Sequence, residues 1–216
     1  MGLITKGILG SISGTVGPVV LCTVNSQEVI KSKPKKSTKA PVQSQLDQRS
    51  KFAMITEFIS YMKNIIVLGY QIHKNKKASP TNIAVKYHLE NAITGVSPDF
   101  KIDFTKVVIS VGKLATSFAA GVPAEGRKFN LTWDDYHDNE DKVLRNTDYL
   151  VVLFYDEITK LFLTYRKMAV RGDLALEIPI SHRFIVNPIH CWTFFVSADG
   201  LTTSKSEYLG EFKMLE

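Results

Sequence analysis

After Lys106 the sequence is organised as short segments whose apolar residues recur with a period of two. A period of two places side chains on one face of a β-strand, as where Phe129, Leu131 and Trp133 alternate with polar residues. The segments predicted as strands are 106–111, 129–133, 149–155, 161–165, 174–178, 191–197 and 204–209. Turn residues separate several of them: Asp156-Glu157, Arg171-Gly172-Asp173, Asn187-Pro188 and Asp199-Gly200. Seven short strands with regular turns predict a β-sandwich or barrel.

The region before these strands holds two predicted helices. One apolar face of the first helix is defined by residues at steps of three and four: Phe52, Ile55, Ile59, Met62 and Ile66. The second is expected to begin near Ser79-Pro80, because Ser can cap a helix and Pro suits its first position. It should end by Gly95. We expect the apolar face to pack on the rest of the protein or on a second subunit.

The first 30 residues combine glycine-rich and β-prone stretches. Five glycines and Pro18 within the first 20 residues favour turns over a stable helix. Val19–Val24 and Gln27–Ile30 predict a hairpin that turns at Asn25-Ser26. A hairpin of this size cannot bury a core alone. We therefore expect it to lie on another part of the protein or on a neighbouring subunit.

A lysine-rich stretch follows the hairpin and predicts an extended linker, since it has two prolines and no apolar periodicity. Its lysines are the predicted partner-binding residues: Lys31, Lys33, Lys35, Lys36 and Lys39. Residues 1–80 hold 12 Lys and Arg against 3 Asp and Glu, a net charge of +9, whereas the remainder holds 15 against 18, a net charge of −3. This asymmetry indicates an acidic partner or the acidic part of a neighbouring copy.

Nucleic acid is one acidic partner that such lysines could meet, because they neutralise phosphates without reading the base sequence. The stretch has no aromatic residue to stack on bases and no arginine to grip a guanine edge. A lysine-rich linker without a partner, an acidic protein partner and nucleic acid all stay open.

Motifs for catalysis or cofactor binding are not found. The glycines between residues 7 and 17 fit neither the dinucleotide fingerprint nor the phosphate loop, and the five histidines show no helical i,i+4 pair. The acidic run Asp134–Asp141 could offer carboxylates to calcium, but it lacks the central Gly and distal Glu of an EF-hand, which favours a solvated loop. Cys22 and Cys191 are expected to be free thiols. We predict no enzyme activity, catalytic residue, cofactor or metal.

A length of 216 residues allows one domain or two, and the change of pattern predicts a boundary between an N-terminal basic segment, 1–105, and a β-sandwich, 106–216. No run of about 18 apolar residues predicts a membrane span. The first residues lack the features of a secretion signal. We expect a soluble protein, with its localisation (cytoplasm or a virion-type assembly) left open.

Three features stand out within 106–216: Leu131-Thr132-Trp133 late in the second strand, Tyr149-Leu150-Val151-Val152 at the start of the third, and Phe195-Val196-Ser197-Ala198-Asp199-Gly200 at the end of the sixth. In these features the segment resembles a fibronectin type III domain. The usual Tyr of the penultimate strand is absent, and Trp192 and Phe194 stand there instead. The resemblance implies an immunoglobulin-like sandwich that serves as an interaction module.

Further stretches run along the whole chain: Gly10-Ser11-Ile12-Ser13-Gly14-Thr15-Val16-Gly17, Lys33-Pro34-Lys35-Lys36, Gln45-Leu46-Asp47-Gln48-Arg49-Ser50-Lys51-Phe52, Asn91-Ala92-Ile93-Thr94-Gly95 and Phe194-Phe195-Val196-Ser197-Ala198-Asp199-Gly200. In these the chain resembles a family of uncharacterised Bacteroidetes proteins, a domain of unknown function. That resemblance implies no activity and no functional residue.

The sequence thus predicts an α+β protein: a Gly-rich β-hairpin and two helices, followed by a seven-stranded antiparallel sandwich of fibronectin III or immunoglobulin type. We expect a non-enzymatic structural or interaction protein, a subunit of a filament or phage virion-type assembly that binds copies of itself or other assembly proteins. The alternative is a non-specific nucleic-acid-binding protein that acts through the basic N-terminal region.

Overall fold

The structure, a computed structural model, describes residues 2–4, 13–24, 27–35, 38–73, 78–134 and 145–215. The chain forms two compact units, residues 1–43 and residues 44–216.

The first unit is a four-stranded antiparallel sheet in the order β1-β4-β3-β2. Its strands are β1 (Gly2–Ile4), β2 (Gly14–Val16), β3 (Val19–Val24) and β4 (Gln27–Ser32). The predicted hairpin is present as β3 and β4, although its expected turn at Asn25-Ser26 lies outside the described residues. Gly17, at the turn from β2 to β3, has φ +57°, a backbone conformation that favours glycine. The sequence did not indicate the two outer strands, which are only three residues long.

Three α-helices are described, instead of the predicted two: α1 (Gln43–Tyr61), α2 (Lys63–Gly69) and α3 (Pro80–Asn91). The expected first helix bends by 86° at Met62 and so becomes α1 and α2. The start of α3 is as predicted, because the Asn82 backbone N–H donates to the Ser79 hydroxyl, 3.2 Å away, and Pro80 takes the first position. Within the described residues no single helix is both long and apolar enough to cross a membrane, and α1 and α2 meet that test only when joined across their bend.

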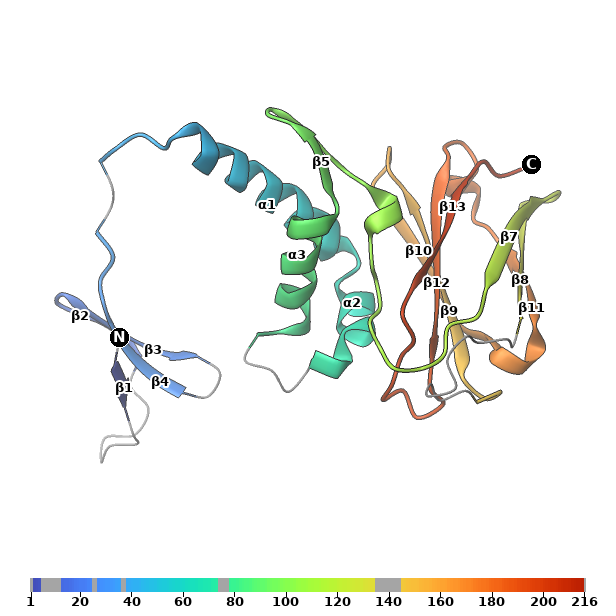
Figure 1. Ribbon diagram of the computed structural model, residues 1–216, viewed down its shortest axis with the longest axis horizontal. Coiled ribbons are helices and arrows are strands. Elements are labelled where there is room, and N and C mark those ends of the chain that lie inside the picture. The colour runs from blue at the N-terminus through green and yellow to red at the C-terminus, as the bar shows by residue number, and fades with distance from the viewer. Residues whose placement is uncertain are drawn as a thin grey trace. The chain divides into compact units, whose positions relative to one another are not determined.

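Two further antiparallel sheets follow the helices, so the fold class is α+β as predicted. A four-stranded sheet has the order β10-β9-β12-β13, and a three-stranded sheet has the order β11-β8-β7 (Figure 1). The strands are β7 (Ala119–Ala124), β8 (Lys128–Trp133), β9 (Tyr149–Asp156), β10 (Leu161–Val170), β11 (Ala175–Pro179), β12 (Ile189–Val196) and β13 (Glu207–Phe212). A short hairpin of β5 (Ile93–Val96) and β6 (Asp99–Ile102) connects α3 to this part of the chain.

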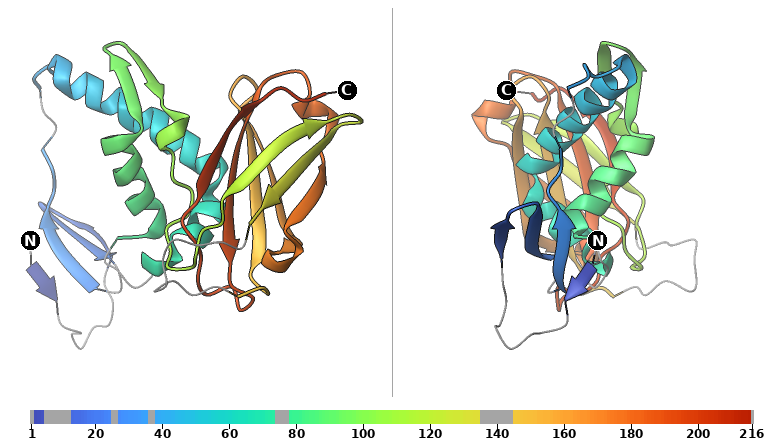
Figure 2. Two further views of the ribbon diagram at one scale, coloured as in Figure 1. Left: turned by 45° about the vertical axis from the view of Figure 1, so that its right-hand side comes forward. Right: turned by 90° about the vertical axis from the view of Figure 1, so that its left-hand side faces the viewer.

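The second unit has three layers, with the four-stranded sheet in the middle (Figures 1 and 2). The helices cover one face of this sheet, where Ile55 and Ile59 of α1 share a core with Val151 of β9 and Trp192 of β12. The three-stranded sheet covers the other face, where the second core lies. Every residue of β12 is therefore buried, whereas β8 alternates between exposed and buried residues.

The predicted strand at 106–111 is wrong, because none of the described strands pairs with Val107–Val111. This segment is extended and largely buried, and its backbone bonds to side chains and to the backbone of Gly69 and Ser206 rather than to a sheet strand. The Tyr70 hydroxyl donates to the Val108 carbonyl oxygen (2.9 Å), the Val108 N–H donates to His88 Nε2 (3.1 Å), and the Ile109 N–H donates to the Ser206 hydroxyl (2.8 Å). The first strand of the three-stranded sheet is β7, whose sequence Ala-Ala-Gly-Val-Pro-Ala carries little alternation.

The helices share a core with the four-stranded sheet, and the division between the two compact units lies between residues 43 and 44. The predicted boundary between residues 105 and 106 runs through that shared core. Independent folding of 106–216 stays a prediction, and a fragment that starts at Ser44 keeps the core whole.

Substitution of Trp133 tests how much the core between the two sheets stabilises the fold. Its side chain is 5% exposed, its indole N–H donates to the Arg171 carbonyl oxygen at 2.8 Å, and its ring meets Phe195. We expect Trp133→Ala to lower the free energy of unfolding by about 3–5 kcal/mol in chemical denaturation, because it leaves a cavity and an unpaired carbonyl. Phe118→Ala, at a site that is 59% exposed, should change it by less than about 0.5 kcal/mol. Equal effects would contradict this account of the core.

His88 makes stability depend on pH. Its ring is fully buried, with Nδ1 2.7 Å from the Ala84 carbonyl oxygen and Nε2 accepting from Val108, which fixes the neutral tautomer that donates through Nδ1. Burial lowers the pKa of His88 below its ordinary 6.5, although the bond to Ala84 opposes this. The unfolded chain therefore binds the proton first as the pH falls below 6.5, so stability should decrease there. Thermal unfolding between about pH 7.5 and 4.5 should show a shallower loss for His88→Gln than for the natural chain, and parallel curves would refute this role.

Candidate functional site

The predicted partner-binding lysines lie on and after the last strand of the N-terminal sheet. Lys31 is on β4, and Lys33, Lys35 and Lys39 follow it; all four are exposed, and Lys36 lies outside the described residues. The Lys33 N–H donates to the Pro18 carbonyl oxygen at 2.7 Å, which ties the start of the basic stretch to the turn between β2 and β3. The basic stretch thus begins on β4, one of the two central strands of the sheet, and continues beyond the end of that strand.

The N-terminal sheet carries apolar side chains on both faces. Leu21 pairs with Ile30 and Cys22 pairs with Val29, and these neighbouring pairs point to opposite faces. Within residues 13–24, 27–35 and 38–43, Val29 alone is buried, while Val19, Val20, Leu21, Cys22 and Ile30 are half-buried. Among these described residues, the sheet therefore has several apolar side chains that are only half-buried.

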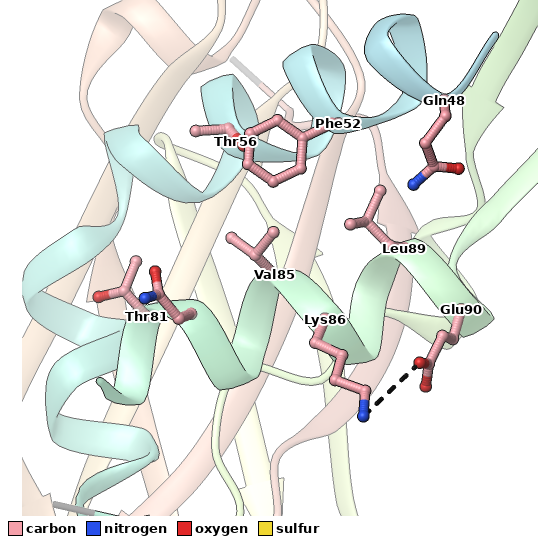
Figure 3. Close-up of a pocket in the computed structure, with 9 residues that line it drawn as sticks. Gln48, Phe52, Thr56, Thr81, Val85, Lys86, Leu89 and Glu90 are labelled. Atoms are coloured by element: carbon pink, nitrogen blue, oxygen red, sulfur yellow. Dashed lines mark ion pairs between the residues drawn. The ribbon is translucent and has the colours of Figure 1, made fainter. Parts of the chain in front are cut away.

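The second unit contains a groove of about 560 Å³ between α1 and α3 (Figure 3). Gln48, Phe52 and Thr56 line it from α1, and Thr81, Asn82, Val85, Lys86, Leu89 and Glu90 line it from α3. These residues form rows spaced by four, the ridges of neighbouring helices. The apolar side chains of Phe52, Val85 and Leu89 point toward one another, and the polar residues stand around them.

Phe52 corrects the predicted apolar face of the first helix. Ile55, Ile59, Met62 and Ile66 are buried as expected, but Phe52 is 51% exposed. The helix α3 packs against α2, whereas the N-terminal half of α1 diverges from α3 and leaves the Phe52 ring beside the groove. Helical spacing alone could not show this divergence, because it does not place the neighbouring helix.

Few of the residues that line the groove are charged. Its only charged lining residues are Lys86 and Glu90, whose charged atoms are 4.0 Å apart and whose side chains are 77% and 62% exposed. A pair so exposed stabilises a helix by about 0.3–0.5 kcal/mol. The other polar lining groups are amides and hydroxyls without a neighbouring base, so the lining residues include no activated nucleophile.

Among the described residues, no three His, Cys, Asp or Glu side chains converge as metal ligands. The acidic run considered for calcium lies outside the described residues beyond Asp134. His190 and Cys191 face opposite sides of β12: His190 Nδ1 is 2.9 Å from the Tyr208 hydroxyl, and Cys191 lies in the core between the sheets. Burial raises the pKa of the Cys191 thiol, and both cysteines are free.

The sequence did not indicate the buried ion pair of Arg171 and Asp148, because Arg171-Gly172-Asp173 was predicted to form a turn. Arg171 and Asp148 are fully buried, with Arg171 Nε 3.7 Å from Asp148 Oδ2. The guanidinium also donates to the Ala115 carbonyl oxygen at 2.7 Å and stacks 3.9 Å from the centre of the Phe195 ring. Burial raises the pKa of Asp148, and the Arg171 charge opposes that shift. The arginine holds the segment that precedes β7 and is not available to a partner.

Comparison with known proteins gives a family but no activity. The model of a family of unknown function (DUF6266) matches residues 11–210. No curated protein matches the chain. The matched residues include most of the N-terminal sheet, the helices and nearly all of both later sheets. Since the match spans well over half of the sequence, this chain belongs to the family of unknown function DUF6266.

Proposed function

We propose that this protein is a non-enzymatic structural or interaction protein, a subunit of a larger filament-type or phage virion-type assembly. It docks on a neighbouring subunit or another assembly protein through its N-terminal sheet and the lysines that follow. The observation that carries this proposal is that apolar side chains lie on both faces of that sheet. Among its described side chains, Val29 alone is buried.

Apolar contact supplies most of the affinity in this proposal. Complete burial of a Val, Leu or Ile side chain contributes about 1.5–3 kcal/mol, so covering the half-buried Val19, Leu21 and Ile30 contributes a few kcal/mol. An exposed ion pair formed by Lys31, Lys33 or Lys35 contributes about 0–1 kcal/mol. The lysines therefore act mainly by selecting an acidic partner and by speeding the encounter. Docking on a partner would also protect the edges of this sheet, whose outer strands β1 and β2 are three residues long, from unwanted pairing.

We also propose that the C-terminal part is a fibronectin III-like sandwich. Strand orders β11-β8-β7 and β10-β9-β12-β13 correspond to E-B-A and C′-C-F-G of the immunoglobulin-like arrangement. The buried Trp133 late in β8 agrees with this assignment. Trp192 and Phe194, which replace the usual Tyr, face the helices, and this added layer accounts for the departure. Sandwiches of this kind often serve as interaction modules, an argument by analogy.

Nucleic-acid binding is the second candidate, favoured by the net charge of +9 in residues 1–80. Exposed Lys31, Lys33 and Lys35 would meet phosphates without base recognition. The absence of Arg, Phe, Tyr and Trp from residues 27–43 argues for the protein partner.

Reversal of the three lysine charges tests both candidates. We expect the variant Lys31→Glu, Lys33→Glu, Lys35→Glu to lower the mass of the assembly in light scattering, most strongly at low salt, where screening is weakest. The matched control reverses three exposed lysines of the second unit: Lys101→Glu, Lys160→Glu and Lys213→Glu. It produces the same change in net charge and should leave the mass unaltered.

The two candidate functions predict different effects of this reversal on nucleic-acid binding and on the oligomeric state. If the lysines serve nucleic acid, their reversal should abolish retention of DNA or RNA, with a steep salt dependence, and leave the oligomeric state unchanged. An unaltered mass together with no retention of nucleic acid by the natural chain would reject both.

A further inference from the structure

We infer that a small hollow beside the end of helix α2 binds a short-chain monocarboxylic acid. The hollow has a volume of about 220 Å³ and is lined by seven residues from three segments. These segments are the short 3-10 helix η1 (Gln71–His73), the chain at 112–113 and the turn at 201–203 that follows β12. This inference goes beyond the proposed function, because such a ligand requires neither a second copy nor the N-terminal sheet.

Hydrogen bonds hold the walls of the hollow together. The Gly69 carbonyl oxygen, at the end of α2, accepts from the Val111 N–H at 2.9 Å and from the Thr203 hydroxyl at 3.3 Å. The Leu114 N–H donates to the Thr203 carbonyl oxygen at 3.1 Å. The hollow is therefore formed before any ligand enters, as ligand sites usually are.

The surface of the hollow is mainly apolar. The side chains of Ile72 and Leu201 are 45% and 71% exposed, so an alkyl chain that lies between them would remove apolar surface from water on both sides. A volume of 220 Å³ equals that of about seven water molecules, at about 30 Å³ each. This volume suits an acid of about six carbons.

A single positive charge stands beside this apolar surface. Lys113 is the only charged residue among the seven that line the hollow, it is exposed, and it forms no ion pair with a described residue. The nearby Asp199 does not line the hollow, and its Oδ1 accepts from the Leu201 N–H at 2.9 Å. An apolar hollow with one ammonium group is complementary to an apolar molecule with one negative charge.

The Gln71 amide provides a second donor. Its Nε2 atom is buried and has no hydrogen-bond partner among the described residues, whereas buried polar groups are usually paired. The side chain as a whole is half-buried, so rotation of the amide can turn this N–H toward the hollow. One carboxylate group can accept from both Gln71 and Lys113, because it has two oxygen atoms.

Titration of the full chain with butyrate, hexanoate and decanoate tests the fit, with backbone amide chemical shifts as the readout. The shifts of Gly112, Lys113 and Thr202 should saturate. Hexanoate should bind at least about tenfold more tightly than butyrate, because two further CH₂ groups leave water. Decanoate should bind no more tightly than hexanoate, because the hollow is then full. Hexanol and hexylamine, which lack the negative charge, should bind at least about tenfold more weakly than hexanoate.

Reversal of the single charge tests the orientation of the ligand. Lys113→Glu should abolish saturable binding of hexanoate and create binding of hexylamine, whose ammonium group then meets the new carboxylate. The matched control, Lys101→Glu, makes the same change of charge at an exposed lysine on β6 and should bind hexanoate like the natural chain. Leu201→Ser should weaken hexanoate about tenfold without favouring hexylamine. The unfolding temperature of each variant shows that it is folded.

Three results would overturn the inference. They are the lack of saturating shifts at Gly112, Lys113 and Thr202 up to about 10 mM hexanoate, equal binding of hexylamine by the natural chain, and shifts that spread over the surface and grow with chain length. The last result would indicate non-specific adsorption. None of them bears on the proposed assembly, which the reversal of the lysines of the N-terminal sheet tests separately.

Discussion

Burial of the four-stranded sheet on both faces is the constraint on which the second unit depends. Its central strands β9 and β12 contribute alternate residues to two cores, one shared with the helices and one shared with the three-stranded sheet. Removing either covering layer would expose a continuous apolar sheet face to water, at a cost of about 25 cal/mol for each Å². The helices are therefore part of the fold of the sheets and not an attachment to a finished sandwich.

The same constraint explains how polar groups are placed inside this unit. The extended chain at Val107–Val111 lies between helices and sheet without a pairing strand among the described residues, so His88, Tyr70 and Ser206 take over its backbone hydrogen bonds. Close approach is required at Gly112, where a Cβ atom would lie 1.7 Å from the Thr203 carbonyl oxygen. On the other side of the sheet, the Arg171 guanidinium holds the chain before β7. Specific side chains thus satisfy part of the buried backbone at Val107–Val111 and before β7.

Local signals predicted the α+β class, the capped start of α3, the alternating strand β8 and the N-terminal hairpin. They failed where a tertiary contact overrides a local pattern. The Val107–Val111 run has strand composition, yet its hydrogen-bond partners come from residues up to 97 positions away. Phe52 has core spacing, yet α3 diverges from it. The continuous apolar runs of β9 and β12 are typical of strands buried on both faces, but only a two-layer sandwich was predicted from them. The groove arises from the angle between two helices, which helical spacing does not determine.

Burial on both faces also limits which residues of a strand can be substituted in this family. In a strand with one exposed face, such as β8, every second residue can be substituted without changing a core. An insertion of two residues also preserves its alternation of exposed and buried residues. The strand β12 has no such position, so nearly every substitution in it alters the volume of one of two cores. Divergence among members of this family should therefore concentrate on the three-stranded sheet and the outer surfaces of the helices. The surfaces that meet partners can then vary while the middle sheet stays fixed.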